Sequence, residues 1–313
     1  MGVKVSICIP CYNNAEEVKR LLDSIYRQDY TDFEVNISDD STDNATETLV
    51  REHYPGVNYC HNPKPYGHIF NWNAAIRMAQ GTYIKILFSD DWFTFSNSLS
   101  KLVELLDNNP KAALAFSGSR QVLLDSQNTT MLHHALENSK ASYDRSADKE
   151  FVDRLRRDYK NLFLGNQIGA PSATLYRRDS ELTFFDERSN WASDMFLYFD
   201  LLQKNPIFAY TTEPLVSIGV HENQYTESFS EKDNRIYEDY RYMYMKYHLQ
   251  ESVACRAYFT EKFILKYHRG LREAKELGID KQMFWSRWII EQKATIQCFL
   301  QNKLRLHSAG RKQ

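Results

Sequence analysis

Residues 83–91 read YIKILFSDD, an apolar run that ends in two adjacent carboxylates. The apolar part can be buried as a strand, but paired carboxylates at its end repel each other and need a cation, hydroxyl groups or water. Residues 33–40 read FEVNISDD, have the same form and end in Asp39 and Asp40. We therefore expect Asp90 and Asp91 to form part of a site at the end of a strand.

Strand and helix patterns alternate on both sides of these runs. Strands are predicted over residues 3–9, 33–38 and 57–60 and from Tyr83, and helices after Asn13, through residues 48–50 and over residues 69–79. This alternation predicts an α/β fold with a mainly parallel, doubly wound sheet and flanking helices. In such a sheet, ligands bind beyond the carboxyl ends of the strands.

Polar residues occupy three of these strand ends, and we expect them to converge on one crevice. They are residues 10–13, the pair Asp39 and Asp40, and residues 89–91. Acids after strands also cap helices, but two separate acidic pairs exceed what capping needs. Neither G-x-G-x-x-G after the first strand nor G-x-x-x-x-G-K-[ST] occurs, so the usual glycine-rich phosphate cradles are missing. Carboxylates can hold a ribose hydroxyl, a base N–H or a divalent cation, which predicts a nucleoside diphosphate bound through Mg²⁺ or Mn²⁺.

Four motifs, in this order, resemble those of the family 2 glycosyltransferases, which have the GT-A fold. The motifs are SICIPCYNN at residues 6–14, SDDSTD at residues 38–43, Gly67 with Asn73, and SDD at residues 89–91. The resemblance runs through roughly residues 3–225. It implies an enzyme that moves a hexose from a nucleoside-diphosphate sugar, with uridine the commonest base, to a hydroxyl of a glycan or lipid-linked acceptor. The implied transfer is metal-dependent and inverting, and belongs to the synthesis of a bacterial-type surface polysaccharide or glycan.

The resemblance also implies which residues bind the donor. The implied nucleotide contacts are Pro10, Tyr12, Asn13, Asp39, Asp40, Asn73 and Asp90. Asp39 would accept from the base N–H and Asp90 would face the ribose, while Asp91 would hold Mn²⁺ or Mg²⁺. One departure is Trp72, because the family often has an arginine there that contacts the diphosphate.

Two residues of the second half complete the implied site. Asp194 opens an apolar helix and resembles the family's catalytic base, although an acid in a first helical turn also complements the helix dipole. His221 follows the last predicted strand, where relatives often place a histidine near the metal. A lone histidine is more often a hydrogen-bonded surface residue, so metal binding and a surface role both stay open.

Two other classes of function compete with this interpretation. One is a nucleotide-sugar-binding protein that has lost the chemistry. The other is a thiol oxidoreductase built on Cys8 and Cys11, which form a Cys-x-x-Cys. Cys8 lies inside an alternating strand pattern rather than at the start of a helix, which favours a buried structural thiol.

The predicted domains are a catalytic domain over residues 1–228 and a helical region over residues 229–313. Residues 284–313 hold six Lys or Arg against one Glu, beside Trp285 and Trp288. This helix would lie on an anionic membrane surface, pack on the catalytic domain or join two copies in a homo-oligomer. Residues 125–149 are polar and are expected to form either a lid or a disordered loop.

Composition limits the cellular setting and the partners. The formal net charge of −2 gives no general attraction to nucleic acid. No apolar stretch of about 18 residues occurs, the N-terminus lacks a signal-peptide pattern, and five cysteines do not suit a disulfide framework. We therefore expect a cytoplasmic protein. The basic helix suggests an alternative, in which the protein also contacts the inner face of the membrane.

Overall fold

The computed structural model describes residues 2–124, 142–179, 181–221 and 224–290. The chain divides into two compact units, Met1–Ser230 and Glu231–Gln313. The predicted roles of residues 1–228 and 229–313 as separate domains stay predictions. The expectations for residues 125–141 and for the basic segment after residue 290 lie outside the described residues.

Four parallel strands form one half of the sheet in the first unit. They are β1 (Val5–Cys11), β2 (Phe33–Asp39), β3 (Asn58–His61) and β4 (Tyr83–Ile86), in the order β3-β2-β1-β4. Cys11 pairs with Asp39 and Asp39 pairs with His61, so the carboxyl ends of three strands lie side by side. This half has the predicted doubly wound form.

The other half of the sheet is mixed. Its strands are β5 (Trp92–Phe93), β6 (Leu114–Leu123), β7 (Ser142–Arg145), β8 (Thr174–Arg177) and β9 (Phe208–Val220). Strand β8 lies antiparallel between β4 and β6, whereas β9 runs parallel to β6. Strands β5 and β7 form antiparallel edges on β9 and β6. The α/β class is confirmed, and the continuous parallel arrangement ends after the first four strands because β8 is antiparallel to both of its neighbours.

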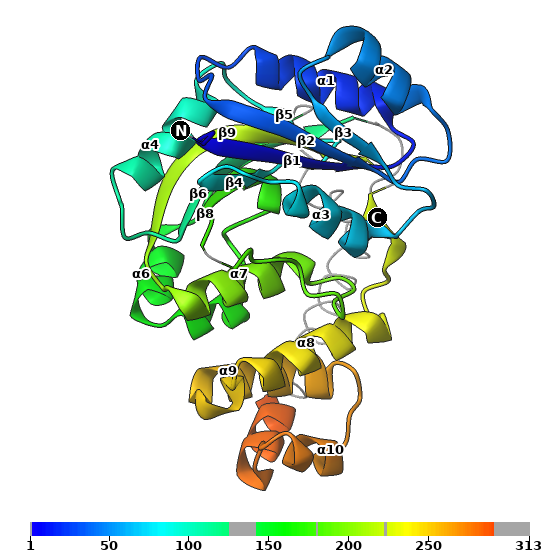
Figure 1. Ribbon diagram of the computed structural model, residues 1–313. Helices are drawn as coiled ribbons and strands as arrows, with labels where there is room; N and C mark the ends of the chain where they lie inside the picture. Colours follow the sequence, from blue (N-terminus) through cyan, green and yellow to red (C-terminus); the bar gives the residue numbers. More distant parts are fainter. Residues whose placement is uncertain (1, 125–141, 180, 222–223, 291–313) are drawn as a thin grey trace, which may run out of the picture. The chain divides into compact units, whose positions relative to one another are not determined.

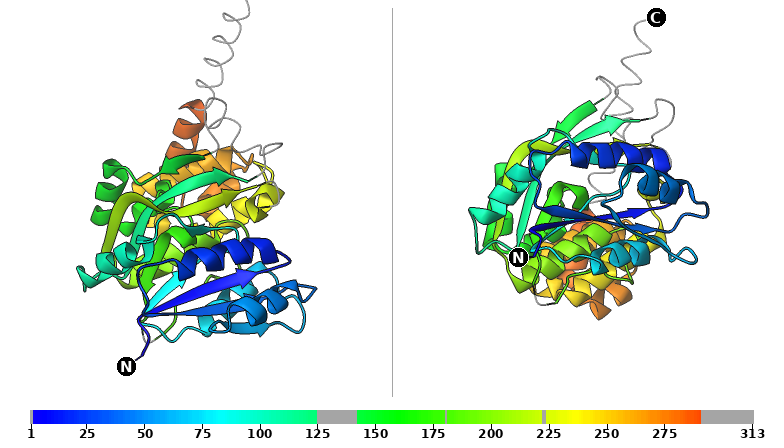
Figure 2. Two further views of the ribbon diagram at one scale, coloured as in Figure 1. Left: turned by 90° about the horizontal axis from the view of Figure 1, so that it is seen from above. Right: turned by 45° about the horizontal axis from the view of Figure 1, so that its top comes forward.

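Helices cover both faces of this sheet (Figures 1 and 2). The α-helices of the first unit are α1 (Ala15–Tyr26), α2 (Ala45–His53), α3 (His68–Arg77), α4 (Ser98–Asp107), α6 (Lys149–Arg157) and α7 (Ser193–Lys204). Short 3₁₀ turns are η1 (Tyr159–Leu164), η2 (Pro171–Ala173) and η3 (Tyr225–Ser228). Helices α1, α2 and α4 lie on one face of the sheet and α3 and α7 on the other (Figure 1).

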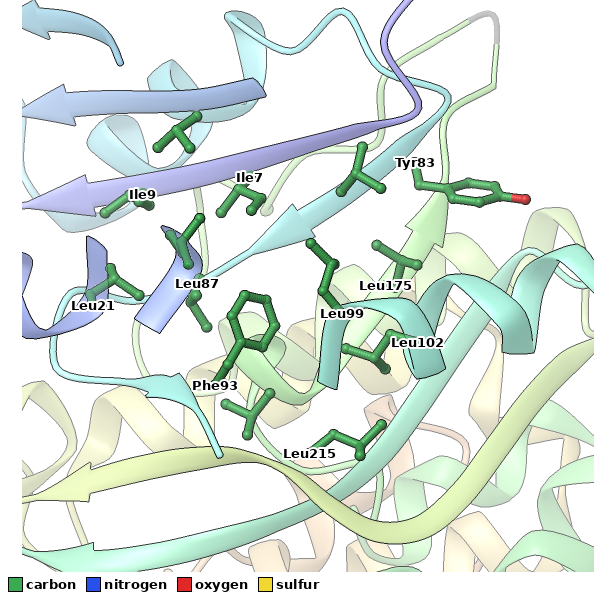
Figure 3. Close-up of a cluster of buried hydrophobic side chains, with 14 of the residues drawn as sticks. Ile7, Ile9, Leu21, Tyr83, Leu87, Phe93, Leu99, Leu102, Leu175 and Leu215 are labelled. Carbon is green, nitrogen blue, oxygen red and sulfur yellow. The ribbon is translucent and has the colours of Figure 1, made fainter. Parts of the chain in front are cut away.

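The core of the first unit lies between β1 and the helices α1 and α4. Ile7 and Ile9 alternate along β1 toward Leu21 of α1, and Leu99 and Leu102 of α4 complete the layer (Figure 3). All five side chains are fully buried. Burial of each such side chain stabilises a fold by about 1.5–3 kcal/mol, so this layer supplies a rigid support for the strand ends.

The second unit is helical, as expected. Its elements are α8 (Asn234–Lys246), the 3₁₀ turn η4 (Leu249–Glu251), α9 (Val253–Phe259), the π-helical turn η5 (Thr260–Leu265) and α10 (Leu271–Glu276). Stacked aromatic rings hold it together, with 4.3 Å between the ring centroids of Tyr244 and Phe259. Trp285 and Trp288 are exposed. Within the described ranges, no helix is both long and apolar enough to cross a bilayer.

Candidate active site

The end of β1 is tied to the end of β2 through Asn13. Asn13 has a φ of +50°, which asparagine tolerates better than most residues. Its backbone N–H donates to the hydroxyl of Ser41 (2.8 Å), and its side-chain oxygen accepts from the backbone N–H of Thr42 (2.8 Å). Pro10 is buried within β1, whereas Tyr12 is 54% exposed and presents its ring beyond the strand end. Tyr12 can therefore stack on a ligand base, while Asn13 holds the loop.

Asp39 lies at the carboxyl end of β2, as predicted, but is completely buried. Its Oδ1 accepts from the backbone N–H of Ser41 (2.8 Å) and its Oδ2 from the hydroxyl of Tyr59 (2.6 Å). Burial, reinforced by this hydrogen bond, raises the pKa of Tyr59. Each carboxylate oxygen keeps a further lone pair, so a ligand N–H can still be accepted where the loop gives access.

Asp40 holds the neighbouring loop. Its Oδ2 accepts from the backbone N–H groups of Tyr66 (2.9 Å) and Gly67 (2.9 Å), and its Oδ1 accepts from the side chain of Asn62 (2.7 Å). Asp40 is only 3% exposed. The expectation that Asp40 contacts the nucleotide is therefore revised, because three donors of the chain occupy its carboxylate.

Asn73 also has a structural partner in place of the expected ligand. Its side-chain oxygen accepts from the backbone N–H of Phe185 (2.9 Å), and its amide donates to the carbonyl of the same residue (3.0 Å). The side chain is 1% exposed. We therefore revise the expectation that Asn73 contacts the nucleotide. Asn73 instead forms a clamp that joins α3 to the segment before α7.

Asp90 and His221 come together from the ends of β4 and β9. The Asp90 Oδ2 and the His221 Nε2 are 3.3 Å apart, and 23% and 25% of the two side chains are exposed. The hydrogen bond with Asp90 raises the pKa of His221. Arg20 of α1 donates to the Asp90 carbonyl (3.2 Å) and so supports the turn. The contact between these two residues gives an accessible carboxylate beside an imidazole.

Asp91 points into the protein, away from this pair. It is 2% exposed, accepts from the Gly219 N–H (3.2 Å) and is hydrogen-bonded to the Ser172 hydroxyl. Burial, followed by the charge of Asp90, raises its pKa. A Cβ at Gly219 would come 2.4 Å from the Asp90 carbonyl oxygen, so only glycine allows β9 to approach the turn this closely. Asp91 therefore joins the turn to β9.

A buried lysine under this turn was missed by sequence reasoning. Lys85 of β4 is completely buried, and its Nζ donates to the carbonyls of Ser172 and Thr174. Burial lowers the pKa of Lys85 to about 7. The available signal was a lysine at an inward position of the apolar run YIKI, because a buried lysine needs nearby acceptors.

The donor set of Asp90 and His221 fits a divalent cation as a partial site. A carboxylate oxygen and an imidazole nitrogen suit Mn²⁺, while Mg²⁺ prefers oxygen ligands alone. Within the described part of the chain, no group of three or more His, Cys, Asp or Glu side chains could hold a metal ion. The protein would thus supply two ligands, and water and the phosphates of a nucleotide the others.

Asp194 lies in the first turn of α7. Its Oδ2 accepts from the Asn166 side chain (2.8 Å), and its Oδ1 from the Met195 backbone N–H (2.7 Å). Burial raises the pKa of Asp194 to about 6, and the two hydrogen bonds oppose that rise. The side chain is still partly accessible. A carboxylate with this pKa is poised to accept a proton near neutral pH, which exceeds what a helix-dipole role requires.

Aromatic side chains from distant segments gather beside the SDD turn. The ring centroid of Trp72 lies 4.7 Å from that of Phe88 and 4.9 Å from that of Phe185. The rings of His68 and Tyr225 are 4.0 Å apart, and His68 also contacts Trp72 at 5.3 Å. Trp72 thus presents an aromatic wall where the family resemblance implied a cation.

The two cysteines of the Cys-x-x-Cys do not have the properties of a redox pair. Cys8 and Cys11 lie within β1, are 0% and 3% exposed, and carry free thiols. Burial raises the pKa of both thiols. Reactive thiols need the opposite, a lowered pKa and access to solvent, so the oxidoreductase interpretation loses its physical basis.

Solved structures share this architecture. The Staphylococcus aureus TarS fragment 1–349 in complex with UDP-GlcNAc has a TM-score of 0.59 at 16% identity, over 91% of this chain and 79% of that chain. The mannosyltransferase from Pyrobaculum calidifontis in complex with GDP-Man and Mn²⁺ has a TM-score of 0.53 at 17% identity, over 92% and 84%. At these identities the likeness concerns the fold, which is of the GT-A type.

Sequence relatives point to the same family. The chain is 38% identical over 91 residues to chondroitin synthase of Escherichia coli, which is 28% of this chain and 13% of that protein. It spans 36% and 66% of the length of two other curated relatives. The sequence profile described as "Glycosyl transferase family 2" matches residues 6–184. Because this match covers more than half of the 313 residues, the chain belongs to glycosyl transferase family 2.

Proposed function

We propose that this protein transfers a hexose from a nucleoside-diphosphate sugar to a hydroxyl of a glycan or lipid-linked acceptor, with inversion at the anomeric carbon. The observation that carries the proposal is Asp194. It combines a pKa raised to about 6 with an orientation set by Asn166 and by the backbone of Met195. A general base works best when its pKa lies near the working pH.

The proposed chemistry is an in-line displacement. Asp194 takes the proton of the acceptor hydroxyl while the oxygen forms a bond to the anomeric carbon. The bond from that carbon to the phosphate oxygen breaks, and the nucleoside diphosphate leaves with the electron pair. Attack on the face opposite the leaving group gives inversion.

The donor side of the proposal uses the ends of β1 and β2. The exposed ring of Tyr12 would stack on the base, and Asp39 would accept from the base N–H. Asp39 can do so only if the loop after β2 moves, because its carboxylate is completely buried. Uracil is the proposed base, and the TarS complex with UDP-GlcNAc gives it support through the shared fold.

The metal assignment changes from the one that the sequence suggested. Asp90 and His221 would hold Mn²⁺ or Mg²⁺, because their side chains are accessible and adjacent, whereas Asp91 is bonded to Gly219 and Ser172. When bound, the cation would offset the negative charge of the diphosphate. The mannosyltransferase complex with Mn²⁺ supports a cation in this fold, and the assignment to Asp90 remains our proposal.

Substitution of Asp194 tests the reaction. Asp194→Asn should lower transfer by at least about 10²-fold, the usual range for loss of a general base, and should leave UDP binding intact. Asp153→Asn, an exposed acid of α6, is the matched control and should keep full activity. Product formation from UDP-GlcNAc, UDP-glucose and GDP-mannose is measured with Mn²⁺, and UDP binding by calorimetry.

The outcomes separate this proposal from a binding protein without chemistry. Retained transfer in Asp194→Asn, with the sample shown free of wild-type protein, would remove Asp194 as the base. Tight, Mn²⁺-dependent UDP binding by the wild-type protein with no turnover of any donor would favour the binding protein.

A further inference from the structure

A small cavity lies beside the segment that orients Asp194. Its volume is about 90 Å³, and its walls come from β6, β9, the end of β7 and the segment that follows Asn166. A cavity of this volume can take a few water molecules or one small polar group, but not a whole sugar. It therefore has the size of a subsite for one substituent.

The β6 wall of this cavity is polar where a buried strand is usually apolar. Ser117, Ser119 and Gln121 line the cavity and are 4%, 6% and 7% exposed. The strand begins with the apolar residues Leu114, Ala115 and Phe116, all fully or almost fully buried. Three polar side chains at alternate positions of one strand carry a desolvation cost that apolar residues would avoid. The polar wall fits a ligand that offers hydrogen bonds.

A cationic side chain is among the residues that line the cavity. Arg145 of β7 pairs across the strands with Ser119 and lines the cavity. The adjacent cross-strand pair, Arg120 and Asp144, forms an ion pair at 2.8 Å. Arg145 is exposed and has no ion-pair partner among the residues that the structure describes. Its guanidinium is therefore available to a carboxylate or a phosphate.

The cavity is connected to both halves of the candidate active site. Ile168 and Gly169 line it, and the side-chain oxygen of Asn166 accepts from the Ile168 N–H (2.9 Å). The amide of the same Asn166 donates to Asp194. On the other side, the Ser117 hydroxyl lies 3.3 Å from the carbonyl of Ala173, next to the serine that holds Asp91.

We propose that this cavity is an acceptor subsite that takes an anionic substituent, a carboxylate or a phosphate, of the sugar that receives the hexose. The inference rests on the proposed function. The serine hydroxyls and the Gln121 amide would donate hydrogen bonds to the substituent, and Arg145 would neutralise its charge. The acceptor hydroxyl would then lie on the Asp194 side of the segment after Asn166.

A matched pair of arginine variants tests the subsite. The acceptors are p-nitrophenyl glucoside, its 6-phosphate and p-nitrophenyl glucuronide, with UDP-GlcNAc, UDP-glucose and GDP-mannose as donors. The wild-type protein should use one of the two anionic acceptors at least tenfold better in kcat/KM than the neutral one. Arg145→Gln should reduce this ratio at least tenfold, because it raises the KM of the anionic acceptor. Arg120→Gln, one residue along β6 from Ser119 and paired with Asp144, should leave the ratio unchanged.

A third variant separates binding from structure. Gln121→Leu replaces a buried polar side chain by an apolar one of similar size, so the melting temperature should stay the same or rise while the ratio falls. A lower melting temperature with an unchanged ratio would give Gln121 a structural role and overturn the proposal. An equal ratio in wild type and Arg145→Gln would also overturn it, and would leave only a water-filled cavity.

Failure of the proposed function is distinguishable from failure of this inference. Turnover of a donor without any preference among acceptors contradicts the subsite alone. If no donor is turned over, the proposed function fails, and the subsite is judged by the melting temperature of the wild-type protein with the glucuronide or the 6-phosphate. If the melting temperature does not rise, or rises equally in Arg145→Gln, the proposed subsite is overturned.

Discussion

The two acidic pairs look alike in the sequence and differ in the structure. Asp39 and Asp40 are both buried, and donors of the chain bond to each of their carboxylates. In the second pair, Asp91 is buried in the same way, whereas Asp90 keeps 23% of its side chain exposed beside His221. In the second pair, one acid holds a neighbouring segment and the other is accessible, whereas both acids of the first pair hold neighbouring segments.

Substitution of each acid of the second pair in turn gives the largest expected effect on transfer. Asp90→Asn should lower transfer by about 10²–10³-fold, because the proposed ligand of the cation that offsets the diphosphate charge is lost. It should also abolish the increase in melting temperature that Mn²⁺ with UDP produces. Asp91→Asn should keep that increase. Melting curves with and without Mn²⁺ and UDP check both, and the reverse result would return the metal to Asp91.

The first pair should lose stability before it loses chemistry. Asp40→Ala leaves the N–H groups of Tyr66 and Gly67 and the Asn62 amide without their acceptor, which should cost about 3 kcal/mol of unfolding free energy. Urea unfolding measures the loss. Asp43→Ala, in the exposed turn that follows, serves as the control and should cost about 1 kcal/mol or less. Loss of nucleotide affinity with unchanged stability would contradict the structural role of Asp40.

Sequence reasoning identified the strand ends but not the direction of each side chain. The alternation of residues and the motifs were enough for the α/β fold and for placing acids at the strand ends, because the carboxyl ends of parallel strands share an edge. The contact between Asp90 and His221 was not predicted. The burial of Asp91 depends on Gly219, 128 residues away, and no local pattern indicates that contact. The same holds for the clamp between Asn73 and Phe185, which are 112 residues apart.

Asp194 extends the comparison to an acid of α7 whose pKa is raised, and this should appear in the pH dependence of activity and stability. Since its pKa is raised to about 6, the base becomes protonated below that pH, and transfer should fall about tenfold per pH unit. The folded protein holds this proton more tightly than the unfolded chain, so the stability gained from it is present at pH 4 and is lost as the pH rises through 6. Asp194→Asn should therefore raise the unfolding free energy at pH 8 by up to about 3 kcal/mol, with no gain near pH 4.

Rate profiles check that transfer falls below pH 6. Urea titrations at several pH values check that Asp194→Asn is more stable than wild type at pH 8 but not near pH 4. A rate that is flat between pH 5 and 7, or an Asp194→Asn variant that is less stable than wild type at pH 8, would contradict the buried base. Asp153→Asn, which changes an exposed acid, should follow the wild-type profile in both measurements.

Tyr59 offers the smallest and most specific test of how Asp39 differs from Asp40. Tyr59→Phe removes one of the two donors that occupy the Asp39 carboxylate and should cost about 1 kcal/mol of unfolding free energy. If Asp39 borders the crevice, the oxygen released becomes a better acceptor for the ring N3–H of uracil. Affinity for UDP should then rise by up to about threefold relative to CDP, because N3 of cytosine carries no hydrogen. Calorimetric titration of both nucleotides measures the ratio, and Tyr54→Phe, which removes the hydroxyl bonded to Asp23, is the control. An unchanged ratio in Tyr59→Phe would give Asp39 the same purely structural role as Asp40, and the donor base would then have to be read by other residues.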